Sequence, residues 1–281
     1  TDSPALVAST SPVEGLPRRQ LPLVPVFAQS VAAVAPSGAA AVIPALVLAT
    51  AGGAGATVAF AAAAVVVLLV AACLRPMAQR MAAVGGIYTY TARGLGPLIA
   101  IPTGWSAIIG YACVGMAGLV AVGTYFSNIA VSAGLAGDIP TAAIIAVLIG
   151  ASIIAAAIMI RGIRVSAWIT LLIECVSIAL LCMLLVLIVV GVSRGGAPAA
   201  AVMDWKGGPQ SFAVSIVVAV SAFVGFESST TLSAEARQPF RSVPLTIRWT
   251  PVVAGVLYMI AVTVLAVALA DAPSSTRTSS T

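Results

Sequence analysis

The chain has 281 residues, of which 61% are hydrophobic and only 7% are charged, with a mean hydropathy of +1.15 and a net charge of +5. Soluble domains are about 45–50% apolar and about 25% charged, so this composition excludes a water-soluble globular protein. It also excludes a disordered chain, whose segments are polar, and a disulfide scaffold, for which four cysteines are too few. The expected fold class is therefore an all-α polytopic membrane helix bundle.

The side chains offer little for catalysis or for nucleic-acid binding. The 13 Lys and Arg residues lie between apolar segments and form no basic patch, so no nucleic-acid partner is expected. There is no histidine, which removes His-based metal sites, triads and proton relays. No nucleophile–base pair, metal-ligand spacing or phosphate-binding loop is recognisable. We therefore expect no enzyme activity, no catalytic residues, no metal and no cofactor.

Three regions follow one another along the chain. Residues 1–20 are polar, have no signal-peptide pattern and are predicted to be a cytoplasmic tail. Residues 21–270 are predicted to form the transmembrane domain, and the Ser/Thr-rich residues 271–281 a polar, disordered tail. A spanning helix needs about 20 apolar residues. The uncharged runs therefore predict seven spans, at 22–50, 53–74, 98–131, 140–160, 165–191, 211–234 and 245–270.

The distribution of positive charge predicts the orientation of these spans. With a cytoplasmic N-terminus, the cytoplasmic segments hold ten of the 13 Lys and Arg residues, as the positive-inside rule requires. We therefore expect a multi-pass protein of the cell (cytoplasmic) membrane, in contact with membrane lipid, with its N-terminus inside and its C-terminus outside. This orientation argues against a G-protein-coupled receptor. A retinal protein would need a Lys in the last span, 245–270, which has none.

The first predicted span contains an unusual run, APSGAA at 35–40. Pro36 has no N–H and its ring clashes with the preceding turn, and Gly38 adds backbone freedom. Both a mid-membrane break and a simple proline kink fit this run. A break would have to line a cavity or be buried in protein.

The sixth predicted span has a matching irregularity, SAFVGFESST at 221–230, which places Gly225 and Glu227 inside an apolar run. An ionised carboxylate at the bilayer centre costs about 3 kcal/mol on insertion scales, so Glu227 is expected to face a cavity. Two interrupted segments at corresponding places are the sequence pattern of a secondary-transporter site. The half-helix that begins at a break offers free N–H groups, and the half-helix that ends there offers free carbonyls. A zwitterion would fit both.

Three stretches carry a resemblance to a known family. They are GGIYTYTARGLGP at 85–97 followed by Gly104-Trp105, FVGFESSTTLSAEARQPFRSVP at 223–244, and the weaker match APSGAA. Together they resemble the amino acid–polyamine–organocation (APC) superfamily of permeases. The resemblance implies a 5+5 inverted-repeat fold with broken helices 1 and 6. It also implies a secondary active transporter that moves amino acids or related amines, coupled to protons as a symporter or working by exchange.

The resemblance also implies roles for individual residues. The substrate carboxylate would meet the N–H groups of Ser37 and Gly38. The substrate ammonium would meet the carbonyls of Val34, Ser221 and Val224. An aromatic side chain, Phe223 or Phe226, would close over the ligand.

Two acidic residues lie inside predicted spans, and each has two interpretations. Glu174 lies where some members of the family carry a Lys in helix 5, and it either couples a proton to transport or forms a structural hydrogen bond. Glu227 either supports the unwound part of helix 6 or exchanges a proton itself. The resemblance also leaves helices 8–10 of the family fold without counterparts. A second hypothesis is therefore a transport-inactive, truncated permease fragment.

Overall fold

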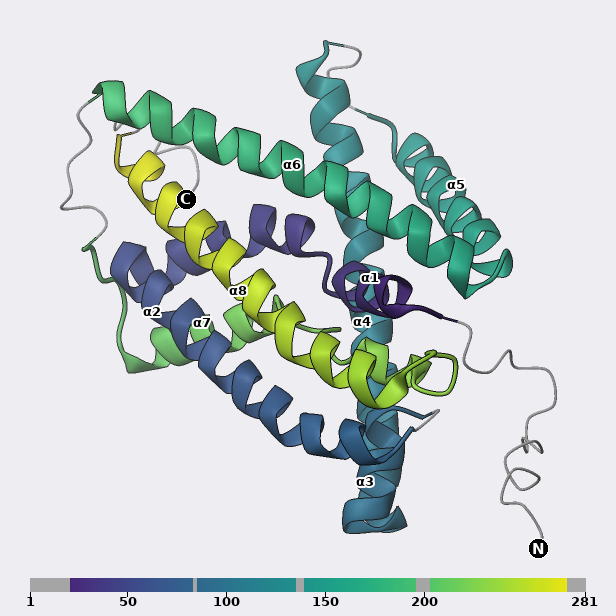
Figure 1. Ribbon diagram of the computed structural model, residues 1–281. Helices are drawn as coiled ribbons and strands as arrows, with labels where there is room; N and C mark the ends of the chain where they lie inside the picture. The colour runs from purple at the N-terminus through teal and green to yellow at the C-terminus, as the bar shows by residue number, and fades with distance from the viewer. Residues whose placement is uncertain (1–20, 83–84, 135–138, 196–202, 272–281) are drawn as a thin grey trace, which may run out of the picture.

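A computed structural model describes residues 21–82, 85–134, 139–195 and 203–271 of the chain (Figure 1). These residues form helices joined by short turns, and the described part contains no β-strand. Several of the helices are long and apolar enough to cross a membrane. The predicted all-α polytopic membrane bundle is therefore confirmed.

The first two predicted spans form one long helical stretch with two interruptions. Helix α1 covers Leu23–Val34 and helix α2 covers Pro36–Arg80. They are separated by Ala35, whose φ of 44° places it in the left-handed region. Proline suits the first position of a helix because that position needs no N–H donor. Pro36 therefore starts α2 directly after the interruption.

The second interruption lies inside α2, where the chain turns at Gly52. This residue has φ 74° and ψ −179°, which is outside the helical region. A Cβ atom there would lie 2.7 Å from the backbone oxygen of Asp204, so glycine is required sterically as well. The turn is held by two backbone bonds, from the Ala54 N–H to Asp204 (3.0 Å) and from the Lys206 N–H to Ala51 (2.9 Å).

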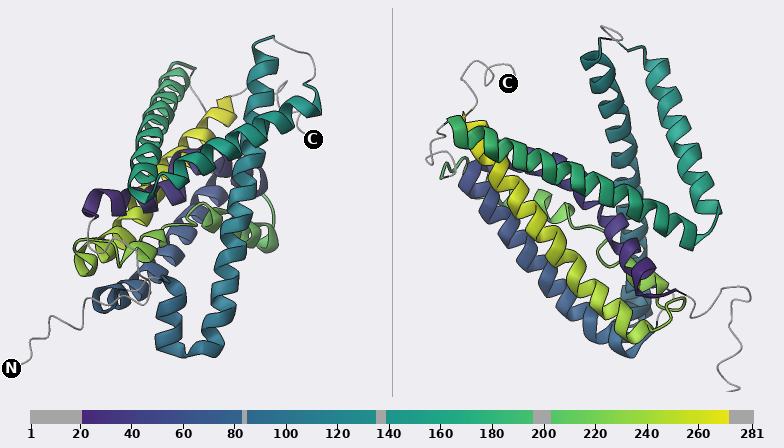
Figure 2. Two further views of the ribbon diagram at one scale, coloured as in Figure 1. Left: turned by 90° about the vertical axis from the view of Figure 1, so that its right-hand side faces the viewer. Right: turned by 45° about the horizontal axis from the view of Figure 1, so that its top comes forward.

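Four helices follow in the middle of the chain, and the first of them was not predicted as an element. They are α3 (Ile87–Leu95), α4 (Pro97–Ser132), α5 (Thr141–Ile160) and α6 (Ile163–Gly195). Helices α4 and α5 extend away from the rest of the bundle (Figure 2). None of the residues of α5 is buried.

The remaining described residues form α7 (Pro209–Ser221), a short 3-10 helix η2 (Ser228–Leu232) and α8 (Pro239–Asp271). The predicted span 211–234 is therefore helical only in its first part, because α7 ends at Ser221 and is followed by turns. Five helical stretches of the described residues are long and apolar enough to cross a membrane. One of them is the whole stretch Leu23–Arg80, which covers two predicted spans.

The core lies between α2 and α8, with α7 packed against α2 and with α1 and α6 packed against α8. Its largest buried side chains include Phe60, Phe223 and Tyr258. The Tyr258 ring meets the edge of Phe223 at a centroid distance of 5.0 Å and lies 5.9 Å from Phe60. These aromatic contacts join α8 to α2 and to the segment after α7.

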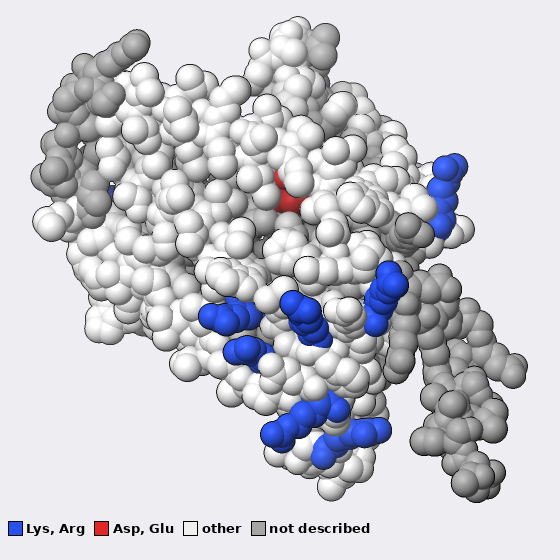
Figure 3. Space-filling model, viewed as in Figure 1, with Lys and Arg blue, Asp and Glu red and all other residues white. Residues whose placement is uncertain are grey.

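Positive charge gathers at one end of the molecule, where α2 and α3 end and α8 begins (Figure 3). The basic residues of these helix ends are Arg75, Arg80, Arg93, Arg241 and Arg248. The loop that carries Asp204 and Lys206 contacts α2 at the turn around Gly52. These two side chains pair at 3.7 Å and are exposed.

Candidate functional site

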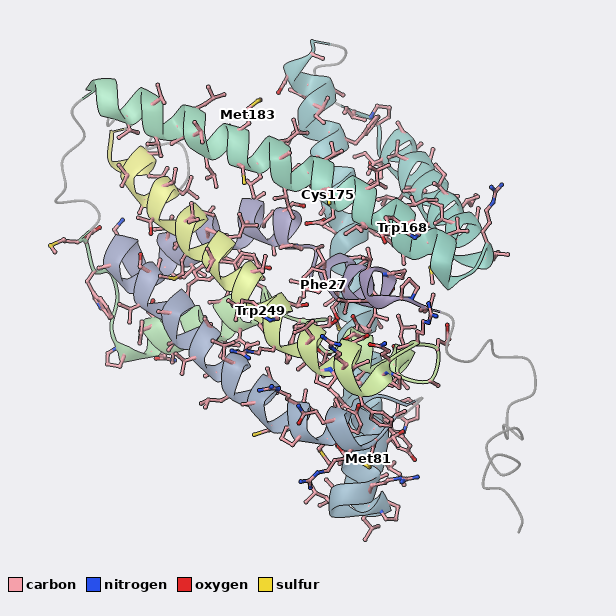
Figure 4. The ribbon with its side chains drawn as sticks, in the orientation of Figure 1. Phe27, Met81, Trp168, Cys175, Met183 and Trp249 are labelled. Atoms are coloured by element: carbon pink, nitrogen blue, oxygen red, sulfur yellow. The ribbon has the colours of Figure 1, made fainter. Side chains whose placement is uncertain are left out.

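The interruption at Ala35 brings a buried carboxyl group to the start of α2. The Ser37 N–H donates a hydrogen bond of 2.8 Å to Oε1 of Glu174, which lies on α6. Glu174 is only 8% exposed. Figure 4 labels Cys175, the next residue, on the part of α6 that passes α1. Two residues that the sequence analysis selected for different roles are therefore in direct contact.

The hydrogen-bond donors of the first turn of α2 can be counted one by one. Pro36 has no N–H, the Ser37 N–H is bound to Glu174, and the Ala39 N–H donates to the Ala35 carbonyl at 3.0 Å. The Gly38 N–H has no partner within the described parts of the chain. Gly38 is exposed, and a Cβ there would meet no atom within 4 Å. The Gly38 N–H is therefore the donor of this helix end that a ligand could bind.

The interruption after α7, residues 222–227, lies directly against the end of α1. Gly225 has φ 103°, and a Cβ there would lie 2.7 Å from the backbone carbonyl C and O of Ala33. The two backbones therefore approach each other more closely than any side chain would allow. The interruptions, which are about 190 residues apart in the sequence, form one region of the structure.

Ser30 of α1 joins the two interruptions by hydrogen bonds. It is fully buried, and its hydroxyl donates to the Phe226 carbonyl at 3.1 Å and accepts from the Ser229 N–H at 3.1 Å. Next to it, the Ser228 hydroxyl donates to the Gln29 carbonyl at 3.3 Å. Backbone groups that the broken helix leaves without helical partners are satisfied in this way.

Glu227 faces a cavity of about 460 Å³, a volume typical of small-molecule sites. Its Oε1 accepts a hydrogen bond of 2.8 Å from the Tyr111 hydroxyl. The aromatic side chains of Tyr88 and Trp105 line the same cavity. The remaining lining residues are Gly85, Ile87, Ile101, Gly104, Ala107, Ile108, Thr230 and Thr231. The lining thus combines three aromatic rings with one carboxyl group and includes no Lys or Arg.

A smaller cavity of about 120 Å³ lies beside the interruption at Ala35. It is lined by Val31 and Val34 of α1, Pro36 of α2, Ile178 of α6 and four residues of α8, which are Thr250, Val253, Ala254 and Leu257. Thr250 is 2% exposed, and its hydroxyl has no hydrogen-bond partner among the described residues. Ile178 follows Glu174 by one helical turn, so this cavity lies on the same side of α6 as the Glu174 carboxyl group.

The other predicted site residues lie around the same two interruptions. Val34 is the last residue of α1, and the Ser221 carbonyl accepts a bond of 3.3 Å from the Val224 N–H. Phe223 is 1% exposed and packs on Tyr258 in the core, and Phe226 is 7% exposed. In this structure neither ring lines the larger cavity.

Sequence reasoning did not select the aromatic residues of the larger cavity. Tyr88 and Trp105 entered only as parts of the family-like motif at 85–105, and Tyr111 was not considered. A signal was nevertheless present, because Gly104, Ile108 and Tyr111 follow the spacing of one helix face. The sequence does not show which segment packs opposite this helix face, and in the structure that segment is the one that carries Glu227.

The fold and this pair of interruptions define a polytopic helical membrane protein with acidic groups beside broken helices. Residues 22–280 match the family described as Amino acid permease, and the chain belongs to that family.

Two curated relatives are similar to part of the chain. They are the low-affinity putrescine importer PlaP of Escherichia coli strain K12 and the protein of the same name from Escherichia coli O157:H7. Each is 24% identical over 190 residues, which is 66% of this chain and 40% of the relative. The chain thus matches less than half of the length of these relatives.

Proposed function

We propose that this chain is the substrate-binding part of a secondary active transporter that moves an amine-bearing solute, an amino acid or a related amine, across the cytoplasmic membrane. The single observation that carries the proposal is the larger cavity, in which Glu227 and three aromatic side chains surround space for a small molecule. Family membership supports transport, and the putrescine importers among the relatives support an amine.

The chemistry of the larger cavity favours a cation. A carboxylate attracts an ammonium group directly, and the faces of Tyr and Trp rings attract cations within about 6 Å. Glu227 already accepts one bond from Tyr111, which fixes the position of its carboxylate oxygens. An ammonium group would therefore meet a held carboxylate and aromatic walls, which is the pre-organised arrangement that binding needs.

The interruptions supply the rest of the proposed site. A substrate carboxylate would approach the N–H groups of Gly38 and of Ser37, and at Ser37 it would have to replace the Glu174 carboxyl group that binds there in this structure. An ammonium group would approach the carbonyls at Val34, Ser221 and Val224. The free ends of broken helices favour these charges. Phe223 or Phe226 would act as the closing aromatic, which requires a rearrangement because both rings are buried in this structure.

Proton coupling is proposed at Glu174, with Glu227 as a supporting group. Intramembrane acidic residues that contact a mobile site are the usual carriers of protons in transporters, and Glu174 contacts the first turn of α2. The end of the molecule that carries the arginines would face the cytoplasm, together with the N-terminus. The second candidate function, a transport-inactive fragment, is the alternative that an uptake measurement tests.

The proposal is tested by amine binding to the purified full chain in lipid nanodiscs, measured by calorimetry with putrescine. We expect Glu227→Gln to weaken binding about tenfold, because a charge-assisted hydrogen bond becomes a neutral one. The control is Asp204→Asn, which makes the same chemical change at an exposed residue outside the cavity. If Glu227→Gln and the unsubstituted chain bind putrescine with equal affinity, the proposed role of the cavity is wrong. A separate measurement of proton-driven uptake into vesicles distinguishes a transporter from an inactive fragment.

A further inference from the structure

We infer that Glu174 is a built-in anion at the first interruption, that it takes the place of a substrate carboxylate, and that it makes this protein select amines without a carboxylate. The inference rests on the proposed function and narrows its substrate class from amine-bearing solutes in general to amine cations. Glu174 is then a specificity-determining residue.

The first step of the argument is the hydrogen bond itself. The Ser37 N–H donates to Glu174 Oε1 at 2.8 Å, within the normal range of an N–H···O hydrogen bond. The two residues are 137 positions apart, so the contact is made by packing of α6 against the interruption and not by local chain geometry. The N-terminus of a helix is a site for an anion, and here the protein supplies that anion from its own chain.

The second step is that little remains for an incoming carboxylate. Of the first-turn donors of α2, the Gly38 N–H alone has no partner among the described residues, because Pro36 has no N–H and the Ser37 N–H is taken. A second carboxylate at Gly38 would lie next to the Glu174 carboxylate, where the like charges repel in a medium of low dielectric constant. Glu174 therefore opposes amino acids and does not oppose amines.

The third step concerns the smaller cavity on the same side of α6 as Glu174. A negative charge on Glu174 would attract a cation that entered this cavity. The 120 Å³ cavity beside the interruption is lined by residues of α1, α2, α6 and α8 and includes no Lys or Arg. It contains the Thr250 side chain, whose buried hydroxyl has no partner among the described residues. Leaving a buried polar group without a partner is unfavourable, so an N–H donor of a ligand that reached this hydroxyl would be favoured.

The test uses two ligands that differ by one carboxylate, putrescine (1,4-diaminobutane) and ornithine. Both have two amino groups on the same four-carbon chain, and ornithine carries the additional carboxylate. Binding of each ligand is measured on the full chain in nanodiscs for the unsubstituted protein, Glu174→Ala and Glu174→Gln. The control is Cys175→Ala, the neighbouring position on α6, which is exposed.

We expect the unsubstituted protein and Cys175→Ala to bind the diamine more tightly than ornithine. In Glu174→Ala and Glu174→Gln the preference should fall at least about tenfold, because the repulsion on the carboxylate is removed and, in the alanine variant, the Ser37 N–H is free as well. An unchanged preference in both variants would overturn the inference. Glu174→Gln has nearly the size of Glu, which guards against a folding defect in the alanine variant.

A second measurement does not depend on transport or on amines. In Glu174→Ala, acetate should bind the vacated Ser37 N–H and raise the melting temperature by roughly 2 °C or more, while the unsubstituted chain and Cys175→Ala show no such shift. If no amine binds any variant but acetate stabilises Glu174→Ala selectively, the proposed function fails and the built-in anion remains. If amines bind and acetate acts equally on all variants, with ornithine still disfavoured, the built-in anion is wrong and the proposed function remains.

Discussion

Tyr111 and Glu227 illustrate how a few polar residues act in a chain that is otherwise apolar. The Tyr111 hydroxyl is 2.8 Å from Glu227 Oε1. Tyr111 lies on α4 and Glu227 in the interruption after α7, 116 positions further along the chain. A carboxyl group in an apolar region needs hydrogen-bond donors, since leaving it without them is costly. Tyr111 therefore both holds Glu227 and forms part of the cavity wall.

The first prediction concerns this tyrosine. Tyr111→Phe keeps the ring and removes the donor, so we expect the affinity for putrescine to fall about threefold to tenfold, as the loss of one hydrogen bond implies. Calorimetric titration of the purified chain measures the effect. Tyr125→Phe on the same helix serves as the control, because Tyr125 is exposed and does not line the cavity. Equal losses in both variants would mean that the hydroxyl of Tyr111 has no special role.

The second prediction concerns Ser30, which makes two hydrogen bonds from a fully buried position. In Ser30→Ala the Phe226 carbonyl and the Ser229 N–H lose their partner in the interior. Each group left without a partner costs about 1–3 kcal/mol, so we expect a clearly lower melting temperature. Ser106→Ala, at an exposed position of α4, should leave the melting temperature unchanged. A decrease of the same size in Ser106→Ala would contradict this interpretation.

At the scale of elements, the close contact between α1 and the segment after α7 is the feature that defines the site. Helix α1 ends at Val34, α7 ends at Ser221, and neither helix continues through the region where their extensions would meet. In place of two continuous helices, the chain has interrupted backbone whose polar groups bond to serine side chains of the other segment, through Ser30 and Ser228. This arrangement explains why the contact tolerates only glycine at Gly225.

The third prediction tests that contact with a matched pair of glycines. Gly225→Ala would place a Cβ 2.7 Å from the Ala33 backbone at a φ of 103°, so the two segments must separate. We expect a loss of stability of about 2 kcal/mol or more together with weaker putrescine binding. Gly118→Ala in α4 meets no atom within 4 Å and should be neutral or slightly stabilising, because alanine is the better helix former. Thermal unfolding and titration of both variants measure the difference.

At the scale of the whole molecule, the sequence predicts the class of fold well because that class follows from local properties. Long uncharged runs predict helices that cross a membrane, and the structure has helices in these runs, although the run 211–234 is α-helical only in its first part. Local signals also indicated where helices are interrupted, since Pro36 follows Ala35 directly and Gly225 lies between α7 and η2. The turn at Gly52 was predicted only as a gap between two spans, because its cause is a distant loop at Asp204.

The site could be predicted only in part, because its contacts join distant helices. Glu174 and Glu227 stand out as acids inside apolar runs, yet the sequence does not reveal that Ser37 and Tyr111 are their partners. Periodicity identifies which residues share a face of one helix, but it contains no information on the register between two helices. An apolar helix in lipid is apolar on all faces, so even the inward face is hard to recognise.

The last prediction uses the uneven distribution of charge over the whole molecule to test its orientation. The arginines of the described residues gather mainly at the end where α2 and α3 finish and α8 begins (Figure 3), whereas Asp204 lies against the turn of α2 at Gly52. If the positive end faces the cytoplasm, a membrane-impermeant maleimide should label Asp204→Cys in intact cells. It should label Arg241→Cys only after the cells are made permeable. Both positions are exposed, so accessibility within the protein does not limit the reaction.

The labelling requires a background without native cysteines, in which Cys73, Cys113, Cys175 and Cys182 are replaced by serine. This background alone should give no signal in either condition. Labelling of Arg241→Cys in intact cells, with protection of Asp204→Cys, would reverse the orientation and place the N-terminus outside. Since the positive-inside rule acts through short loops next to the spans, such a result would also show that the charges at this end of the bundle do not determine how the chain inserts.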